Sequence, residues 1–524
     1  MGYFLPFLSL APYTGTWTNR HAAHLLRRTT FGANFDQIKD FTAQGVDQCV
    51  DQLTRDINMP TPPINVSYAE DPNVPIGETW VDKGTSQNVN GYRRTSLYNW
   101  SFELMLQNNP HIREKMTLFW HNHFVTANIT DPRAVYYYID KLRTFSLGNF
   151  KEMAKVITID YAMLDFLNGR ENTRQAPNEN YARELLELFT LGKGVSEGNG
   201  DYTTYTEGDI KEIARVLTGW VEVRNAIPIR TQFNLSRHDT GTKTLSHRFN
   251  NAIIQNAGAD EYKNLIDLIF TREEVAEFIC KKLYTWFVNH DITDDVVLNV
   301  IKPMADIFRQ NNYEVKPVIK VLLNSEHFYE ECQFGRIVKN PIDYVINPLN
   351  QFSMSLPDDL VLKSRALSGL YNITNAQQMA LYQAPSVAGW QAYYQAPLYY
   401  KLWLNSFSLP SRKSYTDAIA NNGISYGAFR LQIDPVSLAE KCANPTDPEA
   451  LISELSLLFS CLPYATNQMT VLIGVLLGTE TQAQWATKWN NYITSPTTNN
   501  KQLVTTKLRP VITYMTRMPE FHLS

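Results

Sequence analysis

Four polar residues in one segment of the sequence have the types and the spacing that acid–base chemistry requires. They recur at intervals of three and four positions, which places them on one face of a helix: Asn180, Arg183, Glu184 and Glu187. Pro177 suits the first position of that helix, and Gly192 suits its end, where a positive φ is needed. Carboxylates and a guanidinium on a rigid helix, with Glu179 close by, could transfer protons and bind a polar group. The alternative is a solvated face whose charges pair with one another.

Two histidines, His121 and His123, could contribute metal ligands. Imidazole nitrogens combined with carboxylate oxygens of Glu184 or Glu187 would suit zinc, iron or manganese, so we consider a divalent metal as a cofactor. Residues two apart share one side of a strand but lie on nearly opposite sides of a helix. Both histidines can therefore reach one metal only if the preceding helix ends there. The alternative role is that of buried polar groups satisfied by hydrogen bonds.

A further histidine, His238, stands next to Asp239 and beside a glycine turn. A histidine with an adjacent carboxylate could act as an oriented general base or supply ligands. The same residues could equally form an Asx-type turn within a hairpin.

Two adjacent arginines, Arg27 and Arg28, fall at the end of a predicted helix. They could bind an anionic ligand, or they could pair with carboxylates of the same protein. We expect at least one of them to contact Glu184 or Glu187, because buried charges are rarely left unmatched.

Aromatic residues make up 12% of the chain, and many of them lie between Gln383 and Trp403. Prolines and glycines interrupt this segment, so we expect a contact surface and not an unbroken core helix. Tyrosine and tryptophan surfaces stack on sugar rings or on a partner protein. Trp390 and Trp220, each preceded by a glycine, are therefore candidate ligand-binding residues, and core packing is the alternative.

Composition excludes several classes of protein. The 524 residues are 44% hydrophobic and 19% charged, which is an ordinary soluble composition with enough apolar residues for a large core. The net charge of -4 gives no electrostatic basis for binding nucleic acid. The five cysteines are widely spaced and odd in number, which argues against a disulfide framework and a structural zinc site. No stretch approaches the roughly 18 apolar residues of a membrane span.

The periodicity along the chain predicts a mainly α, large multi-helix globular protein with one or two small β-hairpin insertions. Thr206 and Asp209 form a capping box that should begin a helix, which Gly219 ends. Apolar and polar residues alternate between Trp220 and Arg248, which predicts a hairpin near 220–250. We expect residues 1–355 to form a main helical domain with the polar motifs, and residues 356–524 a C-terminal helical part packed on it.

Several motifs, taken in order, resemble the bacterial family catalogued as domain of unknown function 1800. They cover nearly the whole chain: His24–Gly32, Phe119–Phe124, Asp165–Arg170, Pro177–Gly192, Tyr205–Asp209, Thr218–Trp220, His238–Asp239, Pro385–Trp390 and Pro519–Phe521. The resemblance implies a mostly helical protein whose biochemical role is not established. Members are often exported and are commonly encoded beside a second, sulfatase-like exported family. This chain differs in having tyrosines at Tyr393 and Tyr394 where the family has glycines.

Localisation is not determined by these patterns. The apolar N-terminus is short and has no basic residue before Arg20, unlike a secretory signal, so we expect an ordered arm. The resemblance to exported proteins then leaves two expectations, a cytoplasmic protein or one exported together with a partner.

Two functions from different classes follow. The first is an enzyme, a hydrolase or a metal-assisted oxidoreductase acting on an envelope or extracellular polymer, in which Arg183, Arg27 and Arg28 bind an anionic group. Its catalytic candidates are Glu179, Glu184, Glu187, His238 and Asp239. The second is a non-catalytic scaffold or export partner that uses the Tyr/Trp-rich segment as its interface, with the sulfatase-like protein as its expected partner.

Overall fold

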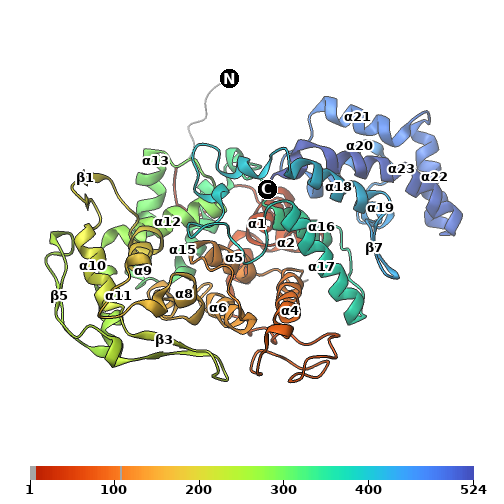
Figure 1. The fold of residues 1–524 in the computed structure, drawn as a ribbon. Helices are drawn as coiled ribbons and strands as arrows, with labels where there is room; N and C mark the ends of the chain where they lie inside the picture. The colour runs from red at the N-terminus through yellow and green to blue at the C-terminus, as the bar shows by residue number, and fades with distance from the viewer. Residues whose placement is uncertain (1–7, 107–108) are drawn as a thin grey trace.

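The computed structural model describes residues 8–106 and 109–524. The chain is mainly helical, and the strands of the described residues form four small two-stranded antiparallel sheets (Figure 1). The predicted fold class is confirmed. Within the described residues, no helix combines the length and the apolar character needed to cross a bilayer.

Side-chain caps decide where many of the helices begin. Thr206 and Asp209 form the predicted capping box, in which each backbone N–H donates to the other side chain, at 2.7 and 3.2 Å. Gly219 follows this helix at a φ of +98°. The helices of the first part of the chain are α1 (Asn19–Thr29), α2 (Phe35–Gln44), α3 (Val46–Thr54), α4 (Gln87–Met105), α5 (Arg113–His123), α6 (Pro132–Thr144), α7 (Phe150–Thr158), α8 (Tyr161–Phe166), α9 (Glu179–Glu184) and α10 (Glu207–Val216).

The remaining helices complete the main body and form a second group. Those of the main body are α11 (Glu261–Ile269), α12 (Glu273–Phe287), α13 (Asp294–Val296), α14 (Lys302–Gln310), α15 (Val315–Asn324), α16 (Pro341–Gln351) and α17 (Leu360–Ala376). The second group consists of α18 (Ser408–Ala420), α19 (Pro435–Ala439), α20 (Pro448–Phe459), α21 (Thr466–Leu477), α22 (Gln482–Thr494) and α23 (Thr498–Arg517). Two segments wind as π-helices, η2 (Leu185–Thr190) and η6 (Val297–Ile301).

The strands pair as local hairpins. The predicted insertion contains β3 (Trp220–Val223) and β4 (Arg230–Phe233), with Trp220 opposite Phe233, and is confirmed. The other pairs are β1 (Ser196–Gly198) with β2 (Asp201–Tyr202), β5 (Lys243–Thr244) with β6 (Ile253–Ile254), and β7 (Ile424–Tyr426) with β8 (Phe429–Leu431).

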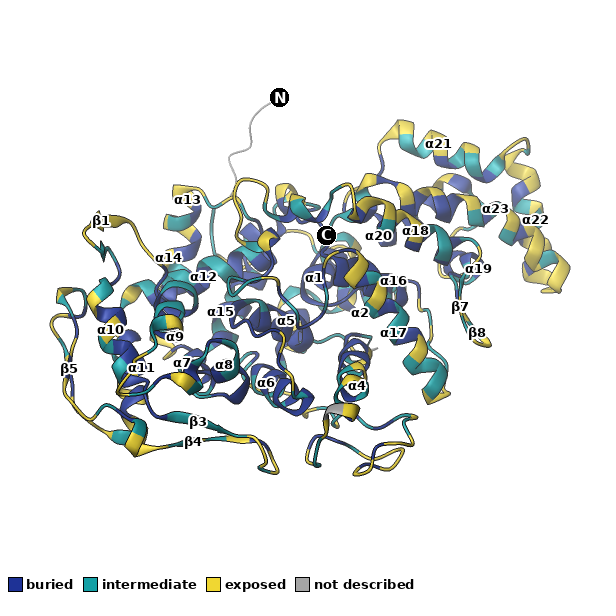
Figure 2. Ribbon diagram, in the orientation of Figure 1, coloured by how far each residue is buried: buried dark blue, intermediate teal, exposed yellow. Residues whose placement is uncertain are grey.

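Helices α18 to α23 form a lobe beside the main body, coloured blue in Figure 1. Helix α20 of this lobe packs against α1, whereas α17 packs against α4 and α18 against α23. The buried residues in Figure 2 lie along the inner faces of the helices in both regions. The boundary at residue 356 stays a prediction.

The aromatic segment between Gln383 and Trp403 is only partly the expected contact surface, because three of its six aromatic rings are buried. Trp390, Tyr400 and Trp403 are buried, because this loop folds back across the main body and its rings fill space between helices. Tyr394 keeps 44% of its surface exposed. The five cysteines are free, and Cys332 alone among them is exposed.

Candidate active site

The polar helix begins later than expected and is not one regular helix from Pro177. Asn178 is its N-cap, and the Asn178 side chain accepts from the Asn180 N–H, so α9 begins at Glu179. From Leu185 the chain winds as the π-helix η2, and Gly192 ends it at a φ of +78°, as predicted. π-Helical turns are rare and frequently lie at functional sites. Glu184 is the last residue of α9 before this turn, and Glu187 lies inside the turn.

Three side chains hold the Glu187 carboxylate. The Tyr205 hydroxyl donates to Glu187 Oε1, and Arg183 Nη1 and Lys193 Nζ lie 3.5 and 3.6 Å from the same oxygen. Tyr205 is buried and enters from the loop before α10, whereas Lys193 follows η2. Two cations and a hydroxyl donor therefore converge on one oxygen of this carboxylate.

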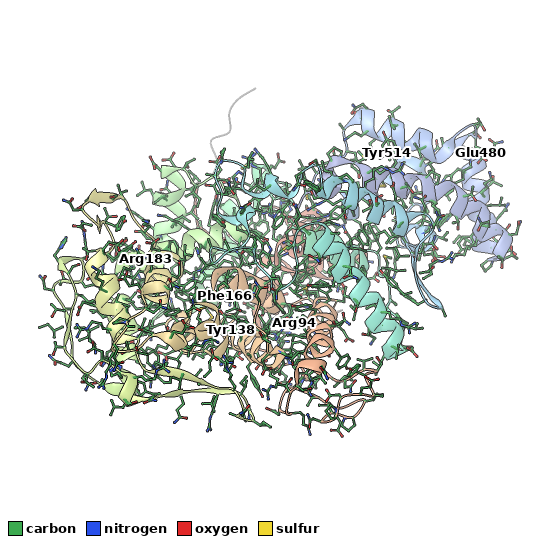
Figure 3. The ribbon with its side chains drawn as sticks, viewed as in Figure 1. Arg94, Tyr138, Phe166, Arg183, Glu480 and Tyr514 are labelled. Atoms are coloured by element: carbon green, nitrogen blue, oxygen red, sulfur yellow. The ribbon has the colours of Figure 1, made fainter. Side chains whose placement is uncertain are left out.

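Arg183 connects the turn to its surroundings. Its guanidinium donates to both carboxylate oxygens of Glu207 at 2.7 and 2.9 Å, and it lies 3.4 Å from Glu179. The hydrogen bond from Arg183 lowers the pKa of Glu207 below its usual value. Figure 3 labels Arg183 where α9 faces α10. This pairing fixes the orientation of the helix that carries Glu184.

Glu184 has different surroundings. Its side chain is half-buried, and among the described residues it makes no hydrogen bond and no ion pair. Burial first, and then the negative charge of Glu187, raise the pKa of Glu184 above its usual value. The two carboxyl groups therefore differ in their surroundings: Glu187 is paired with two cations and a hydroxyl, whereas Glu184 has no partner among the described residues and has a raised pKa. Acid–base catalysis by two carboxyl groups uses such a contrast.

His123 supports this turn and does not join it as a ligand. Its Nε2–H donates to the Phe189 carbonyl at 3.0 Å, which leaves Nδ1 to accept from Lys282 Nζ at 3.1 Å. Lys282 also donates to the Leu188 carbonyl at 3.0 Å. Burial lowers the pKa of Lys282 to about 7. The two side chains thus satisfy carbonyls near the end of η2, which a π-helix leaves without partners.

His121 is fully buried between aromatic rings. Its ring centroid lies 5.1 Å from that of Tyr382 and 6.0 Å from that of Trp390, and burial lowers its pKa to about 4. In the part of the chain that the structure describes, no three histidine, cysteine, aspartate or glutamate side chains gather in a way that could hold a metal ion. The proposed ligand set of His121 or His123 with Glu184 or Glu187 is not assembled there.

His238 and Asp239 lie in a separate charged centre. His238 is fully buried: its Nδ1 donates to the Thr218 carbonyl at 2.9 Å, and its Nε2 lies 3.1 Å from Glu261. Lys243 pairs with the same Glu261 carboxylate. Asp239 faces outward and accepts from Arg215 at 2.7 Å, which lowers the pKa of Asp239. Among the described residues, His238 and Asp239 make no hydrogen bond or ion pair with Glu184 or Glu187. Their contacts fasten the β3–β6 region to α10 and α11.

Arg27 and Arg28 do not contact Glu184 or Glu187, so this expectation is wrong. Arg27 donates to the Leu457 carbonyl in α20. Arg28 donates to the carbonyls of Phe287, Val288 and Gln333. Both arginines lie on the face of α1 that turns toward the C-terminal lobe and α12, which the sequence spacing could not reveal.

The two candidate tryptophans pack within the fold. The Trp390 backbone N–H donates to Asn122 Oδ1 at 3.0 Å, so the Gly-Trp motif rests on the end of α5. Gly389 adopts a φ of +94°, and a Cβ atom there would lie 2.4 Å from Asn122 Oδ1. Trp220 is half-buried in β3 and packs against Phe233 and Tyr262, with ring centroids 5.5 and 5.6 Å apart.

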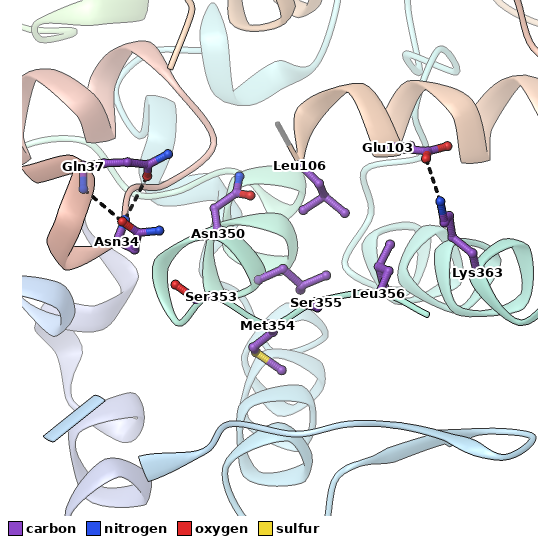
Figure 4. A pocket seen from close by; sticks show the side chains of 11 residues that line it. Asn34, Gln37, Glu103, Leu106, Asn350, Ser353, Met354, Ser355, Leu356 and Lys363 are labelled. Atoms are coloured by element: carbon purple, nitrogen blue, oxygen red, sulfur yellow. Dashed lines mark hydrogen bonds and ion pairs between the residues drawn. The ribbon is translucent and has the colours of Figure 1, made fainter. Parts of the chain in front are cut away.

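A separate hollow is a second candidate site. It has a volume of about 420 Å³ and lies between α2, α4, α16 and α17 (Figure 4). Amides and apolar side chains dominate its lining, and Glu103, the carboxylate drawn there, is paired with Lys363 at 3.1 Å. It lacks the two contrasting carboxylates found at Glu184 and Glu187.

The prediction from sequence missed three members of the site: Lys193, Tyr205 and Glu207. Tyr205 immediately precedes the capping box at Thr206, so its position at the start of α10 was fixed by a recognisable motif. The sequence did not reveal that α10 packs against α9. This packing brings Tyr205 and Glu207 to Arg183 and Glu187.

Comparison with known proteins identifies one similarity. The sequence model of the family described as "Protein of unknown function (DUF1800)" matches residues 24–523. No curated protein and no solved structure matches the chain.

Proposed function

The chain belongs to the DUF1800 family, and we propose that this member is a hydrolase whose catalytic pair is Glu184 and Glu187. The observation that carries the proposal is the contrast within this pair. Glu184 is half-buried and unpaired among the described residues, with a raised pKa, whereas Glu187 is held by Tyr205, Arg183 and Lys193.

Each carboxyl group has a distinct role in the proposed reaction. Protonated Glu184 donates its proton to the leaving oxygen as the scissile bond breaks. The Glu187 carboxylate accepts a proton from the water whose oxygen forms the new bond. A proton then returns from Glu187 to Glu184 through solvent, and both groups are restored. Tyr205, Arg183 and Lys193 hold the Glu187 carboxylate in position for this step.

The position of the pair favours a polymer over a small molecule. Arg183, Lys193 and Glu207 are each about a third or more exposed, so the pair lies near the surface and not in an enclosed pocket. A long chain can reach such a site from outside, as an envelope or extracellular polymer would. The Tyr202 ring, 5.0 Å from Lys193 Nζ, offers a face on which a sugar could stack.

The experiment is a hydrolysis screen on labelled envelope and extracellular polysaccharides. Wild-type protein should release soluble fragments from at least one of them, and Glu187→Gln should lose this activity by about 10²-fold or more. Glu152→Gln is the matched control, because Glu152 is exposed and pairs with Lys155 on the surface. Equal rates for wild type and Glu187→Gln on a substrate that is hydrolysed would refute the proposal.

A competing proposal is a non-catalytic scaffold or export partner, which would suit a sulfatase-like protein. It is supported by three exposed apolar residues, one inside the aromatic segment and two just after it: Leu398, Phe407 and Leu409. Phe407 is 73% exposed. If Phe407→Ser abolished binding to the co-encoded sulfatase-like protein while Glu187→Gln changed nothing in any assay, the scaffold would replace the enzyme.

The metal-assisted oxidoreductase stays a prediction. Elemental analysis of the purified protein tests it, and stoichiometric zinc, iron or manganese would support it.

A further inference from the structure

A small cavity with a cationic lining lies where the two termini of the matched region meet. Arg27 and Arg28 of α1, Lys115 of α5, Asp343 of α16 and Tyr400 of the aromatic segment contribute to its wall. Its free volume is about 20 Å³. That is room for roughly one water molecule or one monatomic ion. The cavity is separate from Glu184 and Glu187, which do not line it.

The side-chain charges of the lining, to which Ser524 also contributes, do not cancel. Lys115 is paired with Asp343, and both side chains are nearly buried. Arg27 and Arg28 are 6% and 3% exposed, and neither forms an ion pair with any carboxylate of the described residues. Their partners are backbone carbonyls, which carry only partial charges. Burying cations without a counter-charge is costly, so this surplus calls for an anion.

Hydrogen-bond donors around the cavity are also left over. Arg28 Nε, Trp286 Nε1 and the Tyr400 hydroxyl are buried and have no hydrogen-bond partner, and all three side chains line the cavity. Tyr400 is 1% exposed, so bulk water does not satisfy its hydroxyl. Buried donors in native proteins are nearly always satisfied by protein groups, ordered water or a ligand. Three such donors beside two unmatched cations are the complement of an anion.

A further buried basic residue, Lys339, stands in the chain between the lining residues Val338 and Asn340. Lys339 donates to the Phe521 carbonyl, and burial, followed by nearby charges that include Arg27, lowers the pKa of Lys339 to about 7. Arg412 donates to the Lys339 carbonyl and leaves its Nε and Nη1 without partners. Arg412 therefore places a further guanidinium with unused donors beside Lys339.

We propose that this cavity binds a monatomic anion, chloride under ordinary conditions, which joins α1 to the aromatic segment and to the C-terminal residues. The size of the cavity decides between anions, because a tetrahedral oxyanion such as phosphate needs more space than one water molecule does. Binding of this kind stabilises the folded protein in proportion to the logarithm of the anion concentration.

The experiment measures thermal unfolding of the full chain in sodium chloride, with sodium gluconate keeping the ionic strength constant. The melting temperature of the wild type should rise with chloride, and bromide should replace chloride. Tyr400→Phe removes one donor and keeps the ring, so the chloride concentration needed for the same rise should increase about tenfold, as expected for one hydrogen bond to a charged group. Tyr464→Phe is the matched control, because its buried hydroxyl also lacks a partner but does not line the cavity.

Crystals soaked in bromide provide a second readout that does not depend on the stability of a variant. An anomalous peak within hydrogen-bond distance of Arg28 and Tyr400 is the expected result. Unfolding that is indifferent to chloride would overturn the proposal, including the case in which the α-carboxylate of Ser524 fills the cavity. An equal chloride response in wild type and Tyr400→Phe, or a response to phosphate and not to halides, would overturn it as well.

Discussion

Glu184 and Glu187 lie three residues apart and experience opposite environments. Arg183, Lys193 and Tyr205 surround Glu187, whereas Glu184 is half-buried and lies near the negative charge of Glu187. An ionised Glu184 side chain in these surroundings lowers the stability of the folded protein. Such a residue is common at functional sites, where stability is sacrificed for chemistry.

Glu184→Gln should therefore stabilise the protein at neutral pH. The folded-state pKa of Glu184 is raised, so wild type loses stability as pH rises from the unfolded value of 4.5 through the folded one. The amide cannot ionise, and we expect a gain on the order of 0.2–0.5 kcal/mol, the size of a like-charge pair on a helix. The gain should disappear below pH 4. Urea unfolding at pH 4 and pH 7.5 measures it, and a loss of stability at pH 7.5 would contradict the prediction.

At the scale of elements, local signals in the sequence predicted some features and missed others. The capping box at Thr206, the alternation after Trp220 and the stop at Gly192 are local patterns, and each predicted an element correctly. The π-helical winding of η2 was missed, because it depends on Lys282 and His123 reaching its carbonyls from other helices. Burial of Trp390 was missed for the same reason, since Asn122 at the end of α5 holds the loop that carries it.

Gly389→Ala should destabilise the protein by at least about 1–2 kcal/mol. That is the cost of placing a side chain in a left-handed conformation, and the clash with Asn122 adds to it. Gly91→Ala is the matched control, because its added Cβ atom meets nothing within 4 Å inside α4. The control should instead stabilise by roughly 0.5–1 kcal/mol. Thermal unfolding of both variants gives the comparison, and equal effects would show that Gly389 is not required.

Glu261→Gln should have a larger effect, about 3–5 kcal/mol of lost stability. Removing this carboxylate leaves Lys243 and His238 without their shared counter-charge in a fully buried position. Glu273→Gln, on the exposed side of α12, should change little. Chemical denaturation measures both. A small effect of Glu261→Gln would contradict the anchoring role of His238 and Asp239 in the β3–β6 region. These two residues would then again be candidates for a catalytic role.

At the scale of the whole molecule, α1 links regions that are far apart in the sequence. Arg27 reaches α20 and Arg28 reaches Phe287 at the end of α12, across 430 and 259 positions. No pattern near residues 27 and 28 specifies such partners, so we predicted a nearer carboxylate. The same long-range contacts set the two lobes side by side and create the cationic cavity. The overall arrangement therefore follows from tertiary contacts that the sequence alone did not reveal.

The most direct test of the proposed active site compares two leaving groups on one scissile linkage. An oligomer of the natural polymer has a leaving oxygen that must be protonated by Glu184. An analogue with an activated aryl leaving group does not need this proton. Glu184→Gln should therefore lose about 10²–10⁴-fold in kcat/KM on the natural oligomer, while keeping most of its rate on the aryl analogue. Glu187→Gln should lose activity on both substrates. Equal losses on the two substrates for Glu184→Gln, or no loss on either, would contradict the assignment of Glu184 as the general acid.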